Sequence, residues 1–78
     1  MPENFMAKLR YNGKLLKASV LPQARKDGMY YEINIPGYPR FYMNWTTMDK
    51  YDLAAGQHVS IPYDLLLLVS DAIEERLR

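Results

Sequence analysis

Apolar and polar residues alternate along most of the first two thirds of the chain. The alternation runs through residues 6–11, 14–21, 29–35 and 40–46. A period of two places every second side chain on the same face of a sheet, so each run predicts a β-strand. Because one face of each strand is apolar and the other polar, the strands are expected to form an antiparallel sheet with one buried face.

The dipeptide Asn12-Gly13 separates the first two runs. Asn-Gly favours a type I′ turn, which needs positive φ at both central residues and joins the strands in one register. In that register Leu9 faces Leu16 on the apolar side, and Lys8 faces Lys17 on the polar side. Two like charges in opposition are unfavourable, so this pair either splays into water or awaits an anion.

A second hairpin is predicted around Pro36-Gly37, which suits the central positions of a type II turn. Side-chain parity requires Ile33 to pair with Phe41 or with Met43. The stretch 22–28 between the two hairpins is predicted to be a polar, mobile connection.

The remaining chain predicts one helix over residues 61–78. Ser60 is its predicted N-cap, and Pro62 suits the first turn. Before it, residues 58–61 predict a short last strand, whereas 46–57 fits either a short helix ending near Gly56 or an irregular loop.

These elements predict an α+β fold: an antiparallel sheet of four to five short strands, in two hairpins, with the C-terminal helix packed on one face. The whole of 1–78 is expected to be one small domain, disordered over 1–5, with the sheet region in 6–61. The predicted core is Leu9, Leu16, Ala18, Val20, Tyr31, Ile33, Ile35, Phe41, Met43, Trp45, Val59, Ile61, Leu65, Leu66, Val69, Ile73 and Leu77.

Composition adds few constraints. The chain of 78 residues has no cysteine, which excludes disulfides and is typical of a reducing compartment. No basic start followed by an apolar run and no membrane-length apolar run is visible, so a cytoplasmic protein without membrane contact is expected. A core this small is often stabilised by self-association, so a homo-oligomer is also expected.

The sequence shows no catalytic motif, no metal-ligand spacing and no phosphate-binding glycine loop. His58 is the single histidine, and Asp49 and Asp52 lack calcium-loop spacing. A non-catalytic protein without cofactor or metal is therefore predicted.

The order of several antiparallel strands followed by one helix resembles the single repeat of PUR-type nucleic-acid-binding proteins. The residues that carry this resemblance are His58-Val59-Ser60-Ile61-Pro62 and the helix after them, the last third of the chain. The segment 46–57 departs from the family's pattern, and no site residue is carried over. The resemblance implies nucleic-acid binding.

Two candidate sites follow from the predicted faces. On the helix, Tyr63 and Leu67 fall on the polar side, where they suit a protein contact such as a two-fold homodimer. On the outer sheet face, cations lie among aromatic residues, an arrangement that single-stranded nucleic acid needs. That set is Lys8, Arg10, Lys17, Tyr30, Arg40 and Tyr42.

The leading hypothesis is a small, self-associating protein–protein interaction module. The alternative is single-stranded nucleic-acid binding through the outer sheet face. A third possibility is that this face itself binds a protein with acidic surface.

Overall fold

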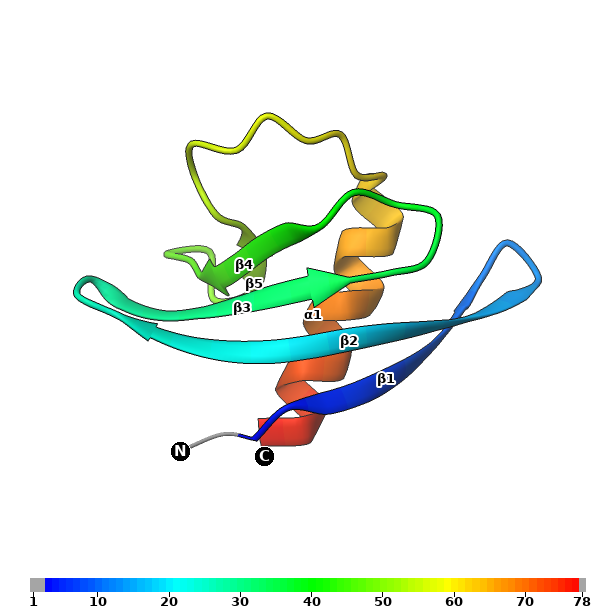
Figure 1. The fold of residues 1–78 in the computed structure, drawn as a ribbon, viewed down its shortest axis with the longest axis horizontal. Helices are drawn as coiled ribbons and strands as arrows, with labels where there is room; N and C mark the ends of the chain where they lie inside the picture. The colour runs from blue at the N-terminus through cyan, green and yellow to red at the C-terminus, as the bar shows by residue number, and fades with distance from the viewer. Residues whose placement is uncertain (1–2, 78) are drawn as a thin grey trace.

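The computed structural model describes residues 3–77, which form one antiparallel sheet covered by one helix (Figure 1). The five strands pair in chain order, so the sheet is a continuous meander. This architecture confirms the predicted α+β fold. The elements are β1 (Phe5–Tyr11), β2 (Lys14–Arg25), β3 (Gly28–Asn34), β4 (Phe41–Trp45), β5 (Tyr51–Leu53) and α1 (Tyr63–Leu77).

The β1–β2 hairpin has the predicted turn and register. Asn12 and Gly13 have φ values of 51° and 75°, as a type I′ turn requires. Leu9 pairs with Leu16 and Lys8 with Lys17. Of the first five residues, expected to be disordered, 1–2 lie outside the described residues and Phe5 already belongs to β1.

Substituting Gly13 tests the turn. Gly13→Val is expected to destabilise the domain by about 1–2 kcal/mol, because a side chain with a branched Cβ is strained at positive φ. Gly13→Asn is the control, because asparagine tolerates this conformation. In urea unfolding, Gly13→Val should have a lower midpoint concentration than Gly13→Asn. Equal midpoints for the two variants would contradict the type I′ assignment.

The prediction of a mobile connection over 22–28 is wrong, because β2 continues through Arg25 and meets β3 at a two-residue turn. Pro22 lies inside this strand, paired with Tyr31. The registers of the β1–β2 and β2–β3 hairpins show that the backbone nitrogen of Pro22 points toward β1. β1 pairs with β2 only as far as Val20, so no backbone group of β1 pairs with Pro22. Pro22 therefore costs the sheet no hydrogen bond there.

The β3–β4 hairpin matches the sequence prediction. The N–H of Tyr38 donates to the carbonyl of Ile35 over 3.1 Å, and Gly37 has a φ of 86°, as in a type II turn. Ile33 pairs with Phe41, one of the two partners that parity allows.

Residues 46–57 contain no helix; they form a turn, the short strand β5 and a non-regular segment over 54–57. Thr46 and Lys50 close a tight turn through the Thr46 N–H and Oγ1, which both donate to the Lys50 carbonyl over 2.9 Å. Asp49 adopts positive φ inside it, and β5 follows. The predicted strand at 58–61 is wrong, because β5 already pairs with the free side of β4.

A side chain anchors the chain after β5. The amide of Gln57 donates to the carbonyls of Tyr42 (2.9 Å) and Ala54 (2.7 Å), and its oxygen accepts the Tyr42 N–H over 2.7 Å. Gln57 thereby takes the part of a strand partner for β4 and keeps this segment beside the sheet.

The helix begins at Tyr63, not at residue 61, and Ser60 is not its cap. The carbonyl of Pro62 accepts the first hydrogen bonds, from the N–H groups of Leu65 and Leu66 at 3.1 Å. A residue before proline is sterically kept extended, so Ile61 cannot be helical. Within residues 3–77 no helix has both the length and the apolar content needed to cross a lipid bilayer.

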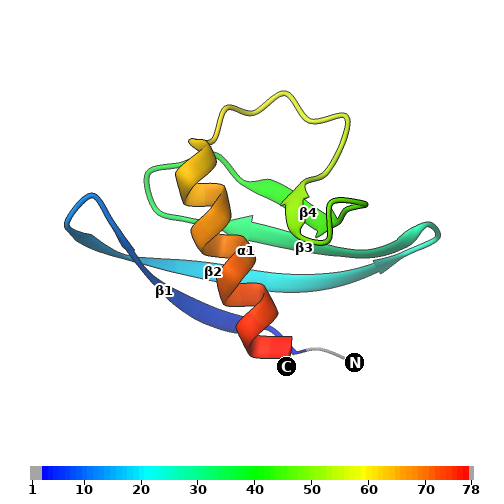
Figure 2. The ribbon, with the colours of Figure 1, turned by 180° about the vertical axis from the view of Figure 1, so that it is seen from behind.

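The core lies between the inner sheet face and α1, which crosses the sheet from β5 toward β1 (Figure 2). Most of the predicted core is buried, with Leu16, Val59 and Ile61 partly buried at its margin. Two predictions are wrong: Trp45 is 51% exposed and Leu77 is 42% exposed. Trp45 packs on Tyr51, which lies next to the helix, and Leu77 is the last residue of α1.

Candidate functional site

The outer sheet face divides the predicted nucleic-acid set into two parts. Lys8, Arg10 and Lys17 are exposed on β1 and β2, with Lys8 opposite Lys17. Tyr30 and Tyr42 lie on β3 and β4 and are partly buried. The structure therefore does not bring Lys8, Arg10 or Lys17 next to the two tyrosine rings.

Arg25 occupies the tyrosine part of this face. Its guanidinium carbon lies 4.3 Å from the ring centre of Tyr30 and 4.9 Å from that of Tyr42. The Tyr30 hydroxyl donates to Asp27 Oδ2 over 2.6 Å, and this bond raises the pKa of Tyr30. Both rings already contact a cation, so a stacking nucleobase would have to displace Arg25.

Glu32 lies beside these rings and places a negative charge on the same face. Its carboxylate accepts hydrogen bonds from Gln23 (3.2 Å), Asn34 (3.0 Å) and the Tyr42 hydroxyl (3.3 Å). Three donors hold the carboxylate in place among partly buried neighbours. A fixed carboxylate at this position repels phosphate, which disfavours a nucleic-acid path across β3 and β4.

Arg40 precedes β4 and is exposed in the loop after β3. Sequence parity had suggested it as a member of the sheet face, whereas Arg25 was not considered because it was assigned to a mobile connection. If the predicted strand had been extended past Pro22, its alternation would have placed Arg25 on the outer face, two residues after Gln23.

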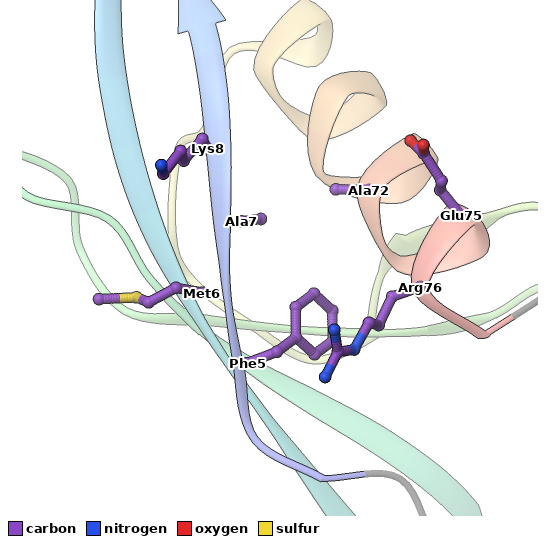
Figure 3. Close-up of a pocket in the computed structure, with 7 residues that line it drawn as sticks. All are labelled: Phe5, Met6, Ala7, Lys8, Ala72, Glu75 and Arg76. Carbon is purple, nitrogen blue, oxygen red and sulfur yellow. The ribbon is translucent and has the colours of Figure 1, made fainter.

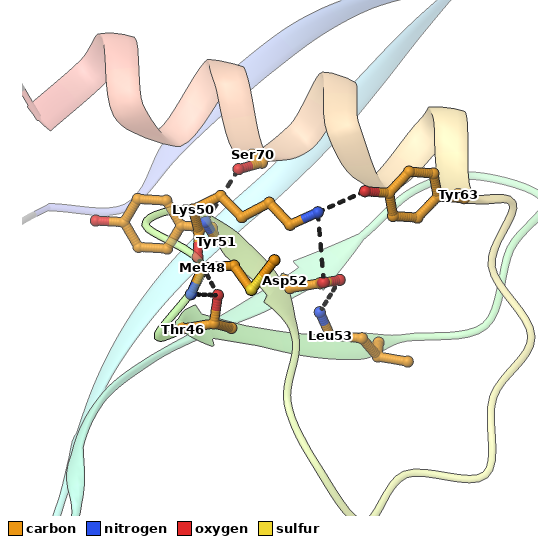
Figure 4. Close-up of polar contacts among 8 residues, drawn as sticks. All are labelled: Thr46, Met48, Lys50, Tyr51, Asp52, Leu53, Tyr63 and Ser70. Atoms are coloured by element: carbon orange, nitrogen blue, oxygen red, sulfur yellow. Dashed lines mark hydrogen bonds and ion pairs between the residues drawn. The ribbon is translucent and has the colours of Figure 1, made fainter.

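The second candidate site lies where the helix meets β5. Tyr63 is 56% exposed, and its hydroxyl accepts a hydrogen bond from Lys50 Nζ (Figure 4). The same ammonium lies 4.8 Å from the Tyr63 ring centre and 3.9 Å from Asp52 Oδ2. The bond to Tyr63 raises the pKa of Lys50.

Ser70 of the helix hydrogen-bonds to the outer side of β5. It is 3% exposed, and its Oγ accepts the backbone N–H of Tyr51 over 3.1 Å (Figure 4). The Tyr51 ring meets Tyr31 and Trp45 edge to face, with ring centres 5.3 and 5.0 Å away. Burial is the main cause that raises the pKa of Tyr51 to about 12.

Exposed apolar side chains gather around this junction. Leu67 lies one helical turn after Tyr63 and one turn before Ser70, so it faces the same side as both. Met48 is 75% exposed in the turn before β5, and Trp45 packs on Tyr51. We call Trp45, Met48, Tyr63 and Leu67 the β5–α1 patch.

A further contact ties the start of the helix to the first hairpin. The Tyr11 hydroxyl donates to Asp64 Oδ1 over 2.9 Å, which raises the pKa of Tyr11, and the same oxygen accepts the Leu65 N–H. This contact fixes the helix across the sheet and carries no chemistry of its own.

Residues 3–77 hold no group of three or more histidine, cysteine or acidic side chains that could bind a metal ion. Comparison of the chain with protein-family models, with curated proteins and with solved structures found no match. The resemblance to PUR-type repeats gains no support, since residues 58–61, which carried it, form no strand.

Proposed function

We propose that this protein is a small, non-catalytic protein–protein interaction module that self-associates through the β5–α1 patch. The observation that carries the proposal is the exposure of four large apolar side chains on the elements that meet at β5 and α1: Trp45 beside Tyr51, Met48 in the turn before β5, and Tyr63 and Leu67 one turn apart on the helix. Large apolar residues that lie together on a surface mark contact sites more often than scattered ones do.

The physical setting of the patch supports a contact between two copies. Trp45 is held by Tyr51, and Tyr63 is held by Lys50, so these two rings would lose little conformational freedom on binding. Rigid aromatic side chains of this kind are the usual anchors of interfaces. A two-fold contact pairs the same patch on both copies and closes the assembly.

The main alternative is binding of single-stranded nucleic acid to the outer sheet face. Arg25 already covers Tyr30 and Tyr42, and Glu32 adds a fixed negative charge beside them. These contacts favour the protein-binding proposal over this alternative.

Sedimentation equilibrium tests the proposal. The wild type is expected to sediment at about twice its 9.1 kDa chain mass, and Leu67→Arg at the chain mass, because a buried unpaired charge is costly. Leu77→Arg is the matched control, since Leu77 is 42% exposed against 38% for Leu67 and lies on the same helix. We expect it to keep the wild-type mass. A monomeric wild type, or a Leu67→Arg variant with wild-type mass, would contradict the proposal.

A further inference from the structure

β1 forms an open edge of the sheet. It is the first strand in the sheet order, so only one of its sides pairs with another strand. The two-residue turn makes Tyr11 and Lys14 a hydrogen-bonded pair. Every second residue before Tyr11 in β1 likewise has its N–H and C=O hydrogen-bonded to β2. The N–H and C=O groups of Met6, Lys8 and Arg10 therefore point to the open side.

The opposite edge is different. β5 has three residues, and the N–H of Tyr51 is already bonded to Ser70 of the helix. An incoming strand would have to break this contact. The seven residues of β1 are thus the edge that suits strand addition.

A groove runs between β1 and the C-terminal half of α1 (Figure 3). It has a volume of about 350 Å³, and Ala7 and Ala72 form its floor. Phe5 and Arg76 close one end, with the guanidinium carbon 5.2 Å from the ring centre. Because two alanines face each other where larger side chains would meet, the groove has room for side chains of an added strand.

The charge along this edge selects the partner. Lys8 and Arg10 are exposed on the outer face of β1, and Lys17 lies across from Lys8. Lys8 also lines the groove, where Arg76 and Glu75 of the helix carry opposite charges. Pairing β1 with β1 of a second copy would bring the lysines and arginines of both copies together, and like charges at this spacing repel. Acidic side chains of an added strand, on that same face, would instead be attracted to Lys8 and Arg10.

We propose that the β1 edge binds an extended acidic peptide segment of another protein as an additional strand. Acidic side chains at every second position lie beside Lys8 and Arg10, and the alternate apolar side chains enter the groove over Ala7 and Ala72. This site goes beyond the proposed self-association, because it uses the opposite edge of the sheet from the β5–α1 patch.

The test uses a capped peptide of alternating glutamate and valine, and an analogue with lysine in place of each glutamate. Hydrogen exchange measured by NMR is expected to slow about tenfold or more at the amides of Met6, Lys8 and Arg10 when the acidic peptide is added. The amides of Ala7 and Leu9, which already bond to β2, should change little. The lysine analogue should give no protection.

Two variants locate the contact. Lys8→Glu is expected to weaken the acidic peptide about tenfold, whereas Lys26→Glu, the same change in the β2–β3 turn, should leave affinity within about twofold. Ala72→Leu fills the groove and should weaken binding without adding charge. Far-UV circular dichroism confirms that each variant is folded.

Several results would overturn the proposal. They are equal binding of both peptides, protection outside β1, and full affinity of Lys8→Glu or of Ala72→Leu. An oligonucleotide that binds Lys8 and Lys17 and displaces the acidic peptide without protecting the β1 amides would assign these cations to nucleic acid. Peptide binding by Leu67→Arg, measured in parallel, separates this proposal from self-association, since we expect it to be unchanged.

Discussion

Replacing Phe41 by alanine is expected to leave the domain predominantly unfolded at 25 °C. Phe41 is fully buried, pairs with Ile33 across the sheet and belongs to the central core. Truncating a buried phenylalanine costs about 3–5 kcal/mol, which is comparable with the roughly 3–5 kcal/mol that a single core of this size supplies at most. The free energy of unfolding of the variant is therefore expected to be close to zero or negative.

Urea unfolding followed by far-UV circular dichroism checks this expectation. Leu15→Ala is the matched control, because it removes a large apolar side chain from the same sheet at a position that is 53% exposed. We expect Leu15→Ala to change the free energy of unfolding by less than about 1 kcal/mol. A folded, cooperative Phe41→Ala variant would show that Phe41 does not hold the core together.

The second large effect is expected at Ser70. Ser70→Ala should destabilise the domain by about 1–3 kcal/mol, because the Tyr51 N–H loses its acceptor, the buried Ser70 hydroxyl, in a partly buried contact. The change also frees β5, so hydrogen exchange at Tyr51 should rise more than exchange in β2 and β3.

Ser60→Ala is the control for Ser70→Ala. Ser60 is exposed two residues before the Pro62 carbonyl that starts the helix, so its hydroxyl is not needed as a cap. We expect the urea midpoint of Ser60→Ala to equal that of the wild type. If the two serine variants unfold at the same urea concentration, the contact between Ser70 and β5 contributes nothing to stability.

Local signals in the sequence predicted the first hairpin and the buried side of the helix. Asn12-Gly13 admits one turn type, and that turn fixes every pair along β1 and β2. The spacing of Leu65, Val69 and Ile73 likewise fixed which side of the helix is buried. In both places a short-range preference and the hydrophobic pattern agree, so together they specify a single local structure.

The candidate sites were harder to predict. The sequence placed Tyr63 and Leu67 outside the core, where the structure also has them, 56% and 38% exposed. It did not indicate the exposure of Trp45 and Met48, because exposure at the end of a strand depends on what packs beyond that strand. It also missed Arg25, since Pro22 resembled a loop residue until the parity of the two hairpins was known.

By itself, then, the sequence determined the elements whose partners lie close along the chain: the two hairpins around Asn12-Gly13 and Pro36-Gly37, and the apolar side of the helix. Only the tertiary structure decided the contacts between distant segments. Gln57 replaces a strand partner for Tyr42, Ser70 takes the free N–H of Tyr51, and β1 is left with an open side. Such contacts depend on which backbone groups remain unpaired after the sheet has formed, and no local periodicity records that.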